Sequence, residues 1–125
     1  MKSNSNDKPQ IIQDLGNGAY YYNCNIVAKT ETDEEGQERK SYDFNCVKFW
    51  GKPTRATIVK AVIRSELDET AEFDLVNGYN AAVEGLLEGA EAEKAKADYI
   101  GYLRRVQEIK TTVKADLAAA GYDTN

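Results

Sequence analysis

The chain has 125 residues, about the length of one domain and enough to bury a single core. Hydrophobic residues make up 42% and charged residues 30%, ordinary values that argue against wholesale disorder. The net charge of −5 disfavours nucleic acid and anionic membranes as partners, because neutralising phosphate needs a basic surface.

The first nine residues are polar, and we expect a flexible tail there. They lack the apolar stretch of a signal peptide, and no later run reaches transmembrane length. We therefore expect a cytoplasmic protein without membrane contacts. Residues 10–125 are predicted to form a single α+β domain, with a β-meander over 10–50 and helices over 54–120.

The predicted meander has three antiparallel strands. A short apolar run at Ile11 and Ile12 precedes the turn signal of residues 16–18, Gly-Asn-Gly. Two longer runs, 19–30 and 39–50, are rich in aromatic and β-branched residues, which suit strands. They flank a charged loop that contains Gly36. These features predict a long β-hairpin.

The hairpin register follows from a three-residue tip at positions 34–36, with Gly36 in the left-handed conformation. Facing residue numbers then add up to 70. This register places Cys24 opposite Cys46 on a mostly apolar face that also holds Trp50. It places Tyr21 opposite Phe49 on the polar face, as an aromatic pair that either a helix covers or a partner binds.

Three helices are predicted after the hairpin. Pro53 ends the strand and Thr54 is a suitable N-cap for a helix over 55–66. A second helix follows the cap signals of residues 65–70. The third and longest covers about 91–120, with Gly121 as its C-cap.

The third helix carries a continuous apolar stripe. At 1.5 Å per residue its length is about 45 Å, whereas a compact domain of this size is only about 36 Å across. We expect the helix to extend beyond its own core, so the stripe predicts an interface for a protein partner or a second copy. The predicted interface residues are Tyr99, Tyr102, Leu103, Val106, Ile109 and Val113.

The sequence contains few of the residue patterns that catalysis or metal binding requires. The absence of histidine excludes Ser–His and Cys–His nucleophiles and histidine metal ligands. Two cysteines cannot complete a structural zinc site, and without a CxxC spacing they are expected to be buried thiols rather than a redox pair. Acidic clusters near residues 33–35 and 66–69 lack calcium-loop spacing and are interpreted as solvated turn carboxylates. We expect no enzyme, no cofactor and no metal.

Charge is unevenly distributed along the middle of the chain. Residues 48–64 contain no acid, whereas residues 66–91 contain eight acids and no base. The basic segment could form a nucleic-acid or ligand site beside an aromatic ring. The rival interpretation is charge complementarity inside the fold or between protomers, which the acidic composition favours. The residues of the alternative site are Trp50, Lys52, Arg55, Lys60 and Arg64.

The segment from 43 to 79, with the pattern FNCVKFWGKPTRATIVKAVIRSELDETAEFDLVNGY, resembles small proteins encoded in phage and prophage tail-region modules of Bacteroidetes. The shared features are a hairpin running into a G-x-P-T helix start, an I-R helix end and an acidic-aromatic second helix. The resemblance implies a phage or prophage accessory protein of the host cytoplasm or the virion. It implies no activity and no site residue.

The leading hypothesis is therefore a non-catalytic interaction or assembly protein that self-associates or docks through its C-terminal helix. The alternative is a nucleic-acid- or ligand-binding module that uses the basic segment 48–64.

Overall fold

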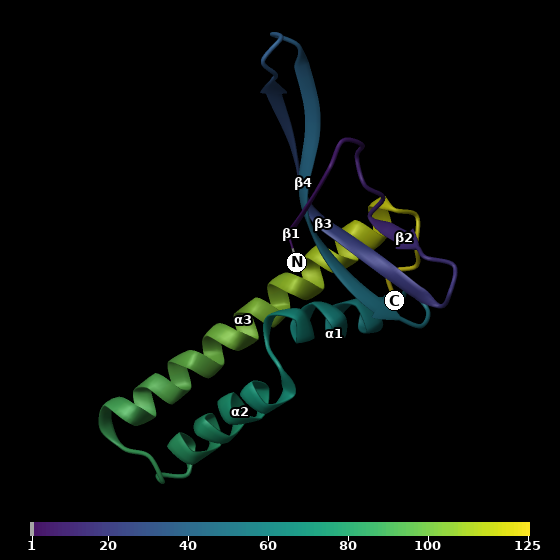
Figure 1. The fold of residues 1–125 in the computed structure, drawn as a ribbon. Helices are drawn as coiled ribbons and strands as arrows, with labels where there is room; N and C mark the ends of the chain where they lie inside the picture. The colour runs from purple at the N-terminus through teal and green to yellow at the C-terminus, as the bar shows by residue number, and fades with distance from the viewer. Residues whose placement is uncertain (1) are drawn as a thin grey trace. The chain divides into compact units, whose positions relative to one another are not determined.

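The computed structural model describes residues 2–125 and confirms the α+β class (Figure 1). In chain order, its elements are β1 (Lys2–Ser5), β2 (Ile12–Asp14), β3 (Ala19–Thr32), β4 (Glu38–Trp50), α1 (Arg55–Glu66), α2 (Glu69–Val83) and α3 (Gly89–Ala119). The chain divides into two compact units. The sheet unit runs through Ala61 and includes Val113–Asn125, and the helical unit is Val62–Thr112.

The sheet has four antiparallel strands in the order β1-β4-β3-β2, not the three that were predicted. The extra strand is β1, which pairs with β4 so that Ser3 faces Phe44 and Ser5 faces Tyr42. The predicted flexible tail is therefore wrong for Lys2–Ser5. A polar edge strand carries no apolar alternation that would reveal it, and its pairing comes from backbone hydrogen bonds to β4.

The hairpin register is confirmed only in its outer half. From the tip down to Val27, which faces Asp43, the pairs are those predicted. Below that point every pair is shifted by one residue, because Asn25 and Ile26 together oppose one residue of β4 in a β-bulge. Asn25 adopts a φ of 53°, in the left-handed region that asparagine tolerates better than most residues.

The bulge exchanges the two faces at the base of the sheet. Tyr22 faces Val47, and Tyr20 stacks on Phe49 with ring centroids 5.3 Å apart. Phe49 is thus buried rather than on the polar face, and Trp50, on the opposite face, is exposed. Since side chains alternate along a strand, a one-residue shift has this effect on every residue below it.

The core of the sheet unit forms where helical segments of that unit meet the base of β3. Its fully buried side chains include Tyr22, Ile58, Val113 and Leu117. The Tyr22 hydroxyl donates a hydrogen bond to the Asp116 carboxylate, which joins the sheet to the last turns of α3. Burial, with the negative charge of Asp116, raises the pKa of Tyr22 far above its usual range, so the hydroxyl keeps its proton.

Local signals define the helix ends. The α1 bounds match the prediction, and the Asp68 carboxylate caps α2 by accepting from the Ala71 amide at 2.8 Å. At the end of α3, Gly121 has a φ of 80°, and the Tyr122 amide donates to the Leu117 carbonyl at 2.9 Å. This is a Schellman motif, as expected for glycine at this position.

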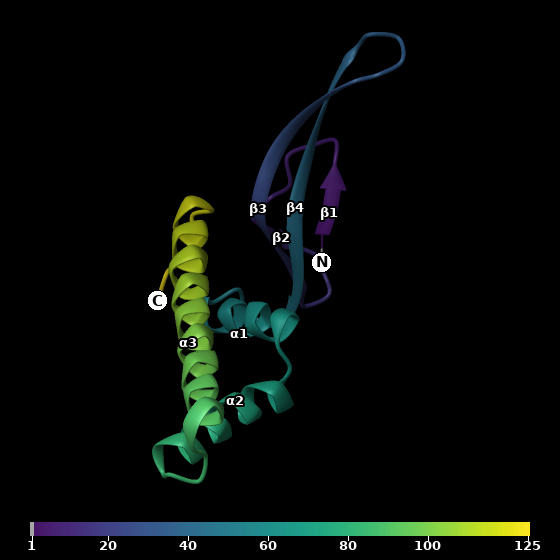
Figure 2. The same cartoon turned by 90° about the vertical axis from the view of Figure 1, so that its left-hand side faces the viewer.

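The helical unit is built on the antiparallel pair formed by α2 and the first part of α3, which lie side by side in both views (Figures 1 and 2). Gly78 of α2 lies against Ala95 of α3, where a Cβ atom at residue 78 would be in ordinary van der Waals contact, 3.6 Å from the Ala95 Cβ. Beside this contact, the rings of Tyr79 and Tyr99 pack at 4.6 Å between centroids, and Tyr102 extends the cluster at 6.3 Å from Tyr99. In the described residues, no helix is long and apolar enough to span a membrane.

Candidate functional site

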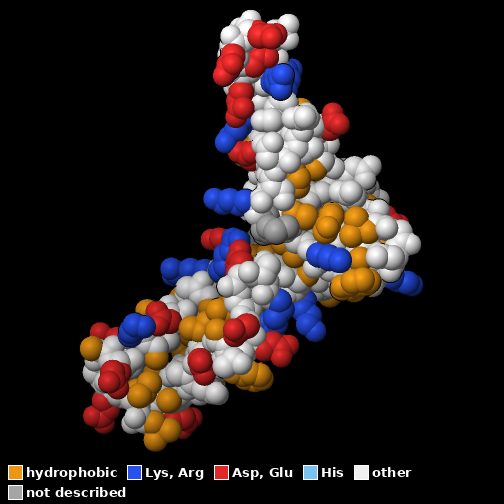
Figure 3. All heavy atoms as spheres, in the orientation of Figure 1, with side chains coloured by type: hydrophobic (Ala, Val, Ile, Leu, Met, Phe, Trp, Pro, Cys, Tyr) orange, Lys and Arg blue, Asp and Glu red, His pale blue; other side chains and the backbone are white. Residues whose placement is uncertain are grey.

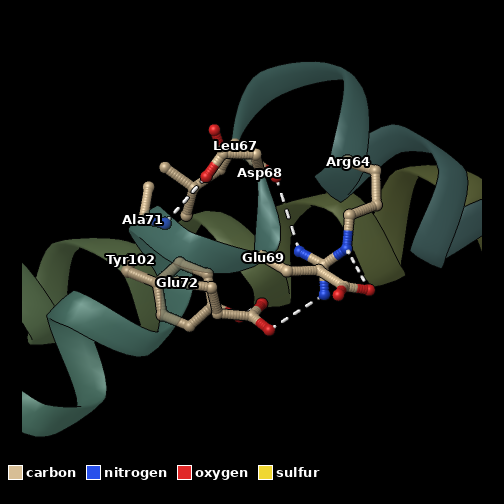
Figure 4. A network of polar contacts seen from close by, with 7 residues as sticks. All are labelled: Arg64, Leu67, Asp68, Glu69, Ala71, Glu72 and Tyr102. Atoms are coloured by element: carbon tan, nitrogen blue, oxygen red, sulfur yellow. Dashed lines mark hydrogen bonds and ion pairs between the residues drawn. The ribbon is translucent and has the colours of Figure 1, made fainter.

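A polar network connects the three helices within the helical unit (Figure 4). Arg64 Nη2 donates to Glu72 Oε1 at 3.0 Å, and Arg64 Nη1 reaches the Leu67 carbonyl at 3.4 Å. The Tyr102 hydroxyl donates to the other oxygen of Glu72. The Glu69 carboxylate adds a longer contact, 3.7 Å from Arg64 Nε. The guanidinium of Arg64 is therefore used to hold α1 against α2.

The network perturbs the proton affinities of its members. The hydrogen bond from Arg64, followed by that from Tyr102, lowers the pKa of the Glu72 carboxyl. Burial and the hydrogen bond to Glu72 raise the pKa of Tyr102 to about 12. Both shifts favour the charge states that form the observed contacts. A second contact of this kind joins Arg105 to both oxygens of Glu66. We interpret these groups as structural.

The predicted interface stripe divides into buried and exposed residues. Ile109 and Val113 are only 3% and 1% exposed, so the chain's own fold covers them and they drop out of the predicted interface. Tyr99, Tyr102 and Val106 are half-buried. Leu103 is 42% exposed and stays a candidate.

The sequence prediction missed exposed apolar residues on and after α2. Phe73 is 66% exposed, and Val83 and Leu86 are also exposed. Val76 and Val83 lie one turn on either side of Tyr79 on α2, and Leu103 lies one turn beyond Tyr99 on α3. Because Tyr79 contacts Tyr99, Val76, Val83 and Leu103 each lie within one turn of the contact between the two helices. We call this surface the apolar face: Phe73, Val76, Tyr79, Val83, Tyr99 and Leu103.

A signal for this face exists in the sequence. The apolar residues of α2 occupy more of the helix circumference than one packing contact needs, which indicates a second contact surface.

Acidic residues are frequent on α2, in the loop after it and at the start of α3. Of the eight acids between residues 66 and 91, Glu66, Glu69 and Glu72 pair with arginines and Asp68 caps α2. The other four have no ion pair in the described part of the chain: Asp74, Glu84, Glu88 and Glu91. Asp74 and Glu91 line a groove together with Lys94, and no residue of the apolar face lines it. Around α2 and the start of α3, acidic and hydrophobic side chains are interspersed (Figure 3).

The predicted basic site keeps four of its five residues. Arg64 is occupied by Glu72 and is lost from it. Trp50 is 60% exposed, and the Lys48 ammonium lies 4.9 Å from the centre of its ring. The predicted site did not include Lys48, because the predicted register placed this residue on the mostly apolar face. Within residues 2–125, none of the remaining cations makes an ion pair. With Lys48 added, the residues that remain are Lys48, Trp50, Lys52, Arg55 and Lys60.

The cysteines do not face each other as predicted. Cys24 faces Asn45 and Cys46 faces Asn23, so the two thiols point to opposite faces of the sheet. Burial raises the pKa of the Cys46 thiol, which lowers its reactivity. The part of the chain that the structure describes contains no cluster of three or more residues suited to hold a metal ion.

At the hairpin tip, acidic side chains gather around Gly36 (Figure 3). Asp33 Oδ1 accepts from the Glu35 and Gln37 amides at 3.0 and 2.8 Å, so this carboxylate stabilises the turn. Glu34 and Glu35 are exposed.

Comparison of the chain with protein-family models, with curated proteins and with solved structures finds no match.

Proposed function

We propose that this protein is a non-catalytic interaction and assembly protein that self-associates through its helical unit. The observation that carries the proposal is the apolar face, in which Phe73, Val83 and Leu103 remain exposed although the same helices already pack a half-buried tyrosine cluster between them. Several exposed apolar side chains on one helix pair are typical of protein–protein contacts.

Three titratable groups with shifted pKa values support a structural role. Tyr22, Glu72 and Tyr102 are each engaged by a partner from another helix or strand of their own unit. They lock elements together rather than face an open site.

Sedimentation velocity over a range of protein concentrations tests the proposal. The wild type should form a dimer or larger species at high micromolar concentration. The double substitution Phe73→Ser/Leu103→Ser should lower the association constant by about tenfold or more, because burying one Phe or Leu side chain contributes about 1.5–3 kcal/mol. A matched control is Val27→Ser, which alters an exposed apolar residue on the hairpin.

Two results would count against the proposal. A wild type that sediments as a monomer at every concentration removes self-association. Equal weakening by Val27→Ser removes the assignment to the helical unit.

The resemblance to phage tail-region proteins supports a setting in virion assembly. Tail or capsid genes beside the gene for this protein would agree with that setting, and a neighbourhood of unrelated metabolic genes would contradict it.

A further inference from the structure

An open groove lies along α2 and the first part of α3, within the helical unit. Its volume is about 530 Å³. Most of the side chains that line it are half-buried leucines and small residues: Leu67, Ala71, Leu75, Gly78, Leu87 and Ala95. No residue of the apolar face is among them, so the groove is distinct from the residues assigned to self-association.

The groove continues along α3. A smaller depression of about 220 Å³ shares Leu67 and Leu75 with it. The α3 residues that line the two follow one another at spacings of three or four positions or less, from Glu91 to Ile109. Such spacing follows one face of a helix, and from residue 91 to residue 109 that face is about 27 Å long. An elongated apolar groove of this length fits a helix.

Gly78 lies inside α2 and lines the groove. A Cβ atom at residue 78 would be in ordinary contact with Ala95, and the φ of Gly78 is outside the left-handed region. Neither the packing of α2 on α3 nor the local backbone therefore requires glycine. Because glycine destabilises a helix interior relative to alanine, its presence has a cost. What the missing Cβ provides is room for another chain to approach α2 closely.

The charged residues that line the groove have an excess of acids. The bases are already paired within the fold, Lys94 with Asp98 at 2.8 Å and Arg105 with Glu66. Two exposed carboxylates, one on each helix, have no ion pair in the described part of the chain: Asp74 on α2 and Glu91 on α3. A partner with cations beside its apolar side chains complements this lining.

We propose that the groove binds an amphipathic, basic helix of another protein. The apolar face of that helix packs against the leucines and small residues of the groove, and its lysine or arginine side chains pair with Asp74 and Glu91. This contact does not depend on self-association. It gives the helical unit a second binding surface, for a partner of a different kind.

Fluorescence anisotropy with a defined peptide tests the contact. The probe is a fluorescein-labelled peptide of about 14 residues, or four helical turns, with leucine at every third or fourth position and lysine elsewhere. The protein should bind it with a dissociation constant in the micromolar range. Two control peptides should bind about tenfold more weakly or worse: one with glutamate in place of lysine, and one of the same composition in an order that removes the apolar face. Failure to bind the probe, or equal binding of the reordered peptide, overturns the inference.

A charge variant locates the binding site. Asp74→Asn/Glu91→Gln should lower the affinity for the probe by about fivefold, as two exposed charge pairs are expected to contribute. Glu34→Gln/Glu35→Gln changes the net charge equally at the hairpin tip and should bind like the wild type. Equal weakening by both variants would show attraction to the net charge of −5 rather than to the groove, and would overturn the inference.

Gly78→Ala separates binding from stability. The new methyl group occupies the groove, so the affinity for the probe should fall, while the melting temperature should stay the same or rise because alanine favours the helix. Gly101→Ala is the matched control, since Gly101 lines neither the groove nor the smaller depression. It should leave the affinity unchanged. Unchanged affinity in Gly78→Ala would contradict a close approach to α2.

The inference and the proposed function can fail separately. Phe73→Ser/Leu103→Ser should bind the probe like the wild type, because neither residue lines the groove. A monomeric wild type that binds the probe removes the proposed function and supports the groove contact. A wild type that self-associates without binding the probe does the reverse. If the unlabelled peptide dissociates the wild-type assembly in sedimentation velocity, the groove belongs to the contact between copies, and the inference of a different partner is overturned.

Discussion

Tyr22 makes the polar contact that joins the sheet to the end of α3, and its removal should have a measurable cost. Tyr22→Phe deletes only the hydroxyl that donates to Asp116 and keeps the ring, so no large cavity forms. A hydrogen bond to a charged group contributes about 1.5–3 kcal/mol. Asp116 is half-buried and water can partly replace the lost donor. We therefore expect a loss of about 1.5 kcal/mol in the free energy of unfolding.

Urea denaturation followed by circular dichroism measures this loss. A double-mutant cycle with Asp116→Ala isolates the pair, because the cost of Tyr22→Phe should almost vanish when Asp116 is already absent. If Tyr22→Phe costs less than about 0.5 kcal/mol, or costs the same in both backgrounds, the hydrogen bond is not a stabilising contact.

Alkaline pH gives an independent check of the same contact. The pKa of Tyr22 is raised in the folded state from an ordinary value of 10.0, so above that pH the unfolded chain loses the proton first. The stabilisation is complete below pH 10.0 and decreases above it, by up to about 1.4 kcal/mol per pH unit. The stability curves of the wild type and Tyr22→Phe should therefore converge above pH 10. Parallel curves would contradict the assignment.

Three further substitutions have defined outcomes. Gly101→Ala should stabilise the protein by about 1 kcal/mol, since this α3 residue has helical backbone and open space around its Cβ position. Gly121→Ala should instead destabilise the protein by about 1 kcal/mol, because the φ of Gly121 is 80°. The melting temperatures of the two variants should shift in opposite directions, and shifts in the same direction would contradict the role of Gly121 as a C-cap. Glu72→Gln should lower stability by about 1 kcal/mol at neutral pH, with Glu93→Gln as an exposed control. Because contacts from Arg64 lower the pKa of Glu72, this difference should shrink as the pH falls below the ordinary glutamate range, and a constant difference would contradict the ion pair.

Local patterns in the sequence determined most of the secondary structure. Proline, capping residues and apolar periodicity act within a few residues of the feature that they define, so α1 and the hairpin tip are where the sequence places them. The same holds for Gly121, whose cap depends only on the adjacent turn of α3. The α+β class follows from these elements together.

Tertiary structure alone decided which side chains are available for binding. The bulge at Asn25 and Ile26 turns Trp50 and Lys48 outward and Phe49 inward, although a bulge-free hairpin has an equally regular apolar pattern. On α3, one continuous stripe supplies Leu103 to the surface and Ile109 to the core. Periodicity identifies the face of a helix or strand, but the neighbours that cover it come from distant parts of the chain, and no local pattern encodes them.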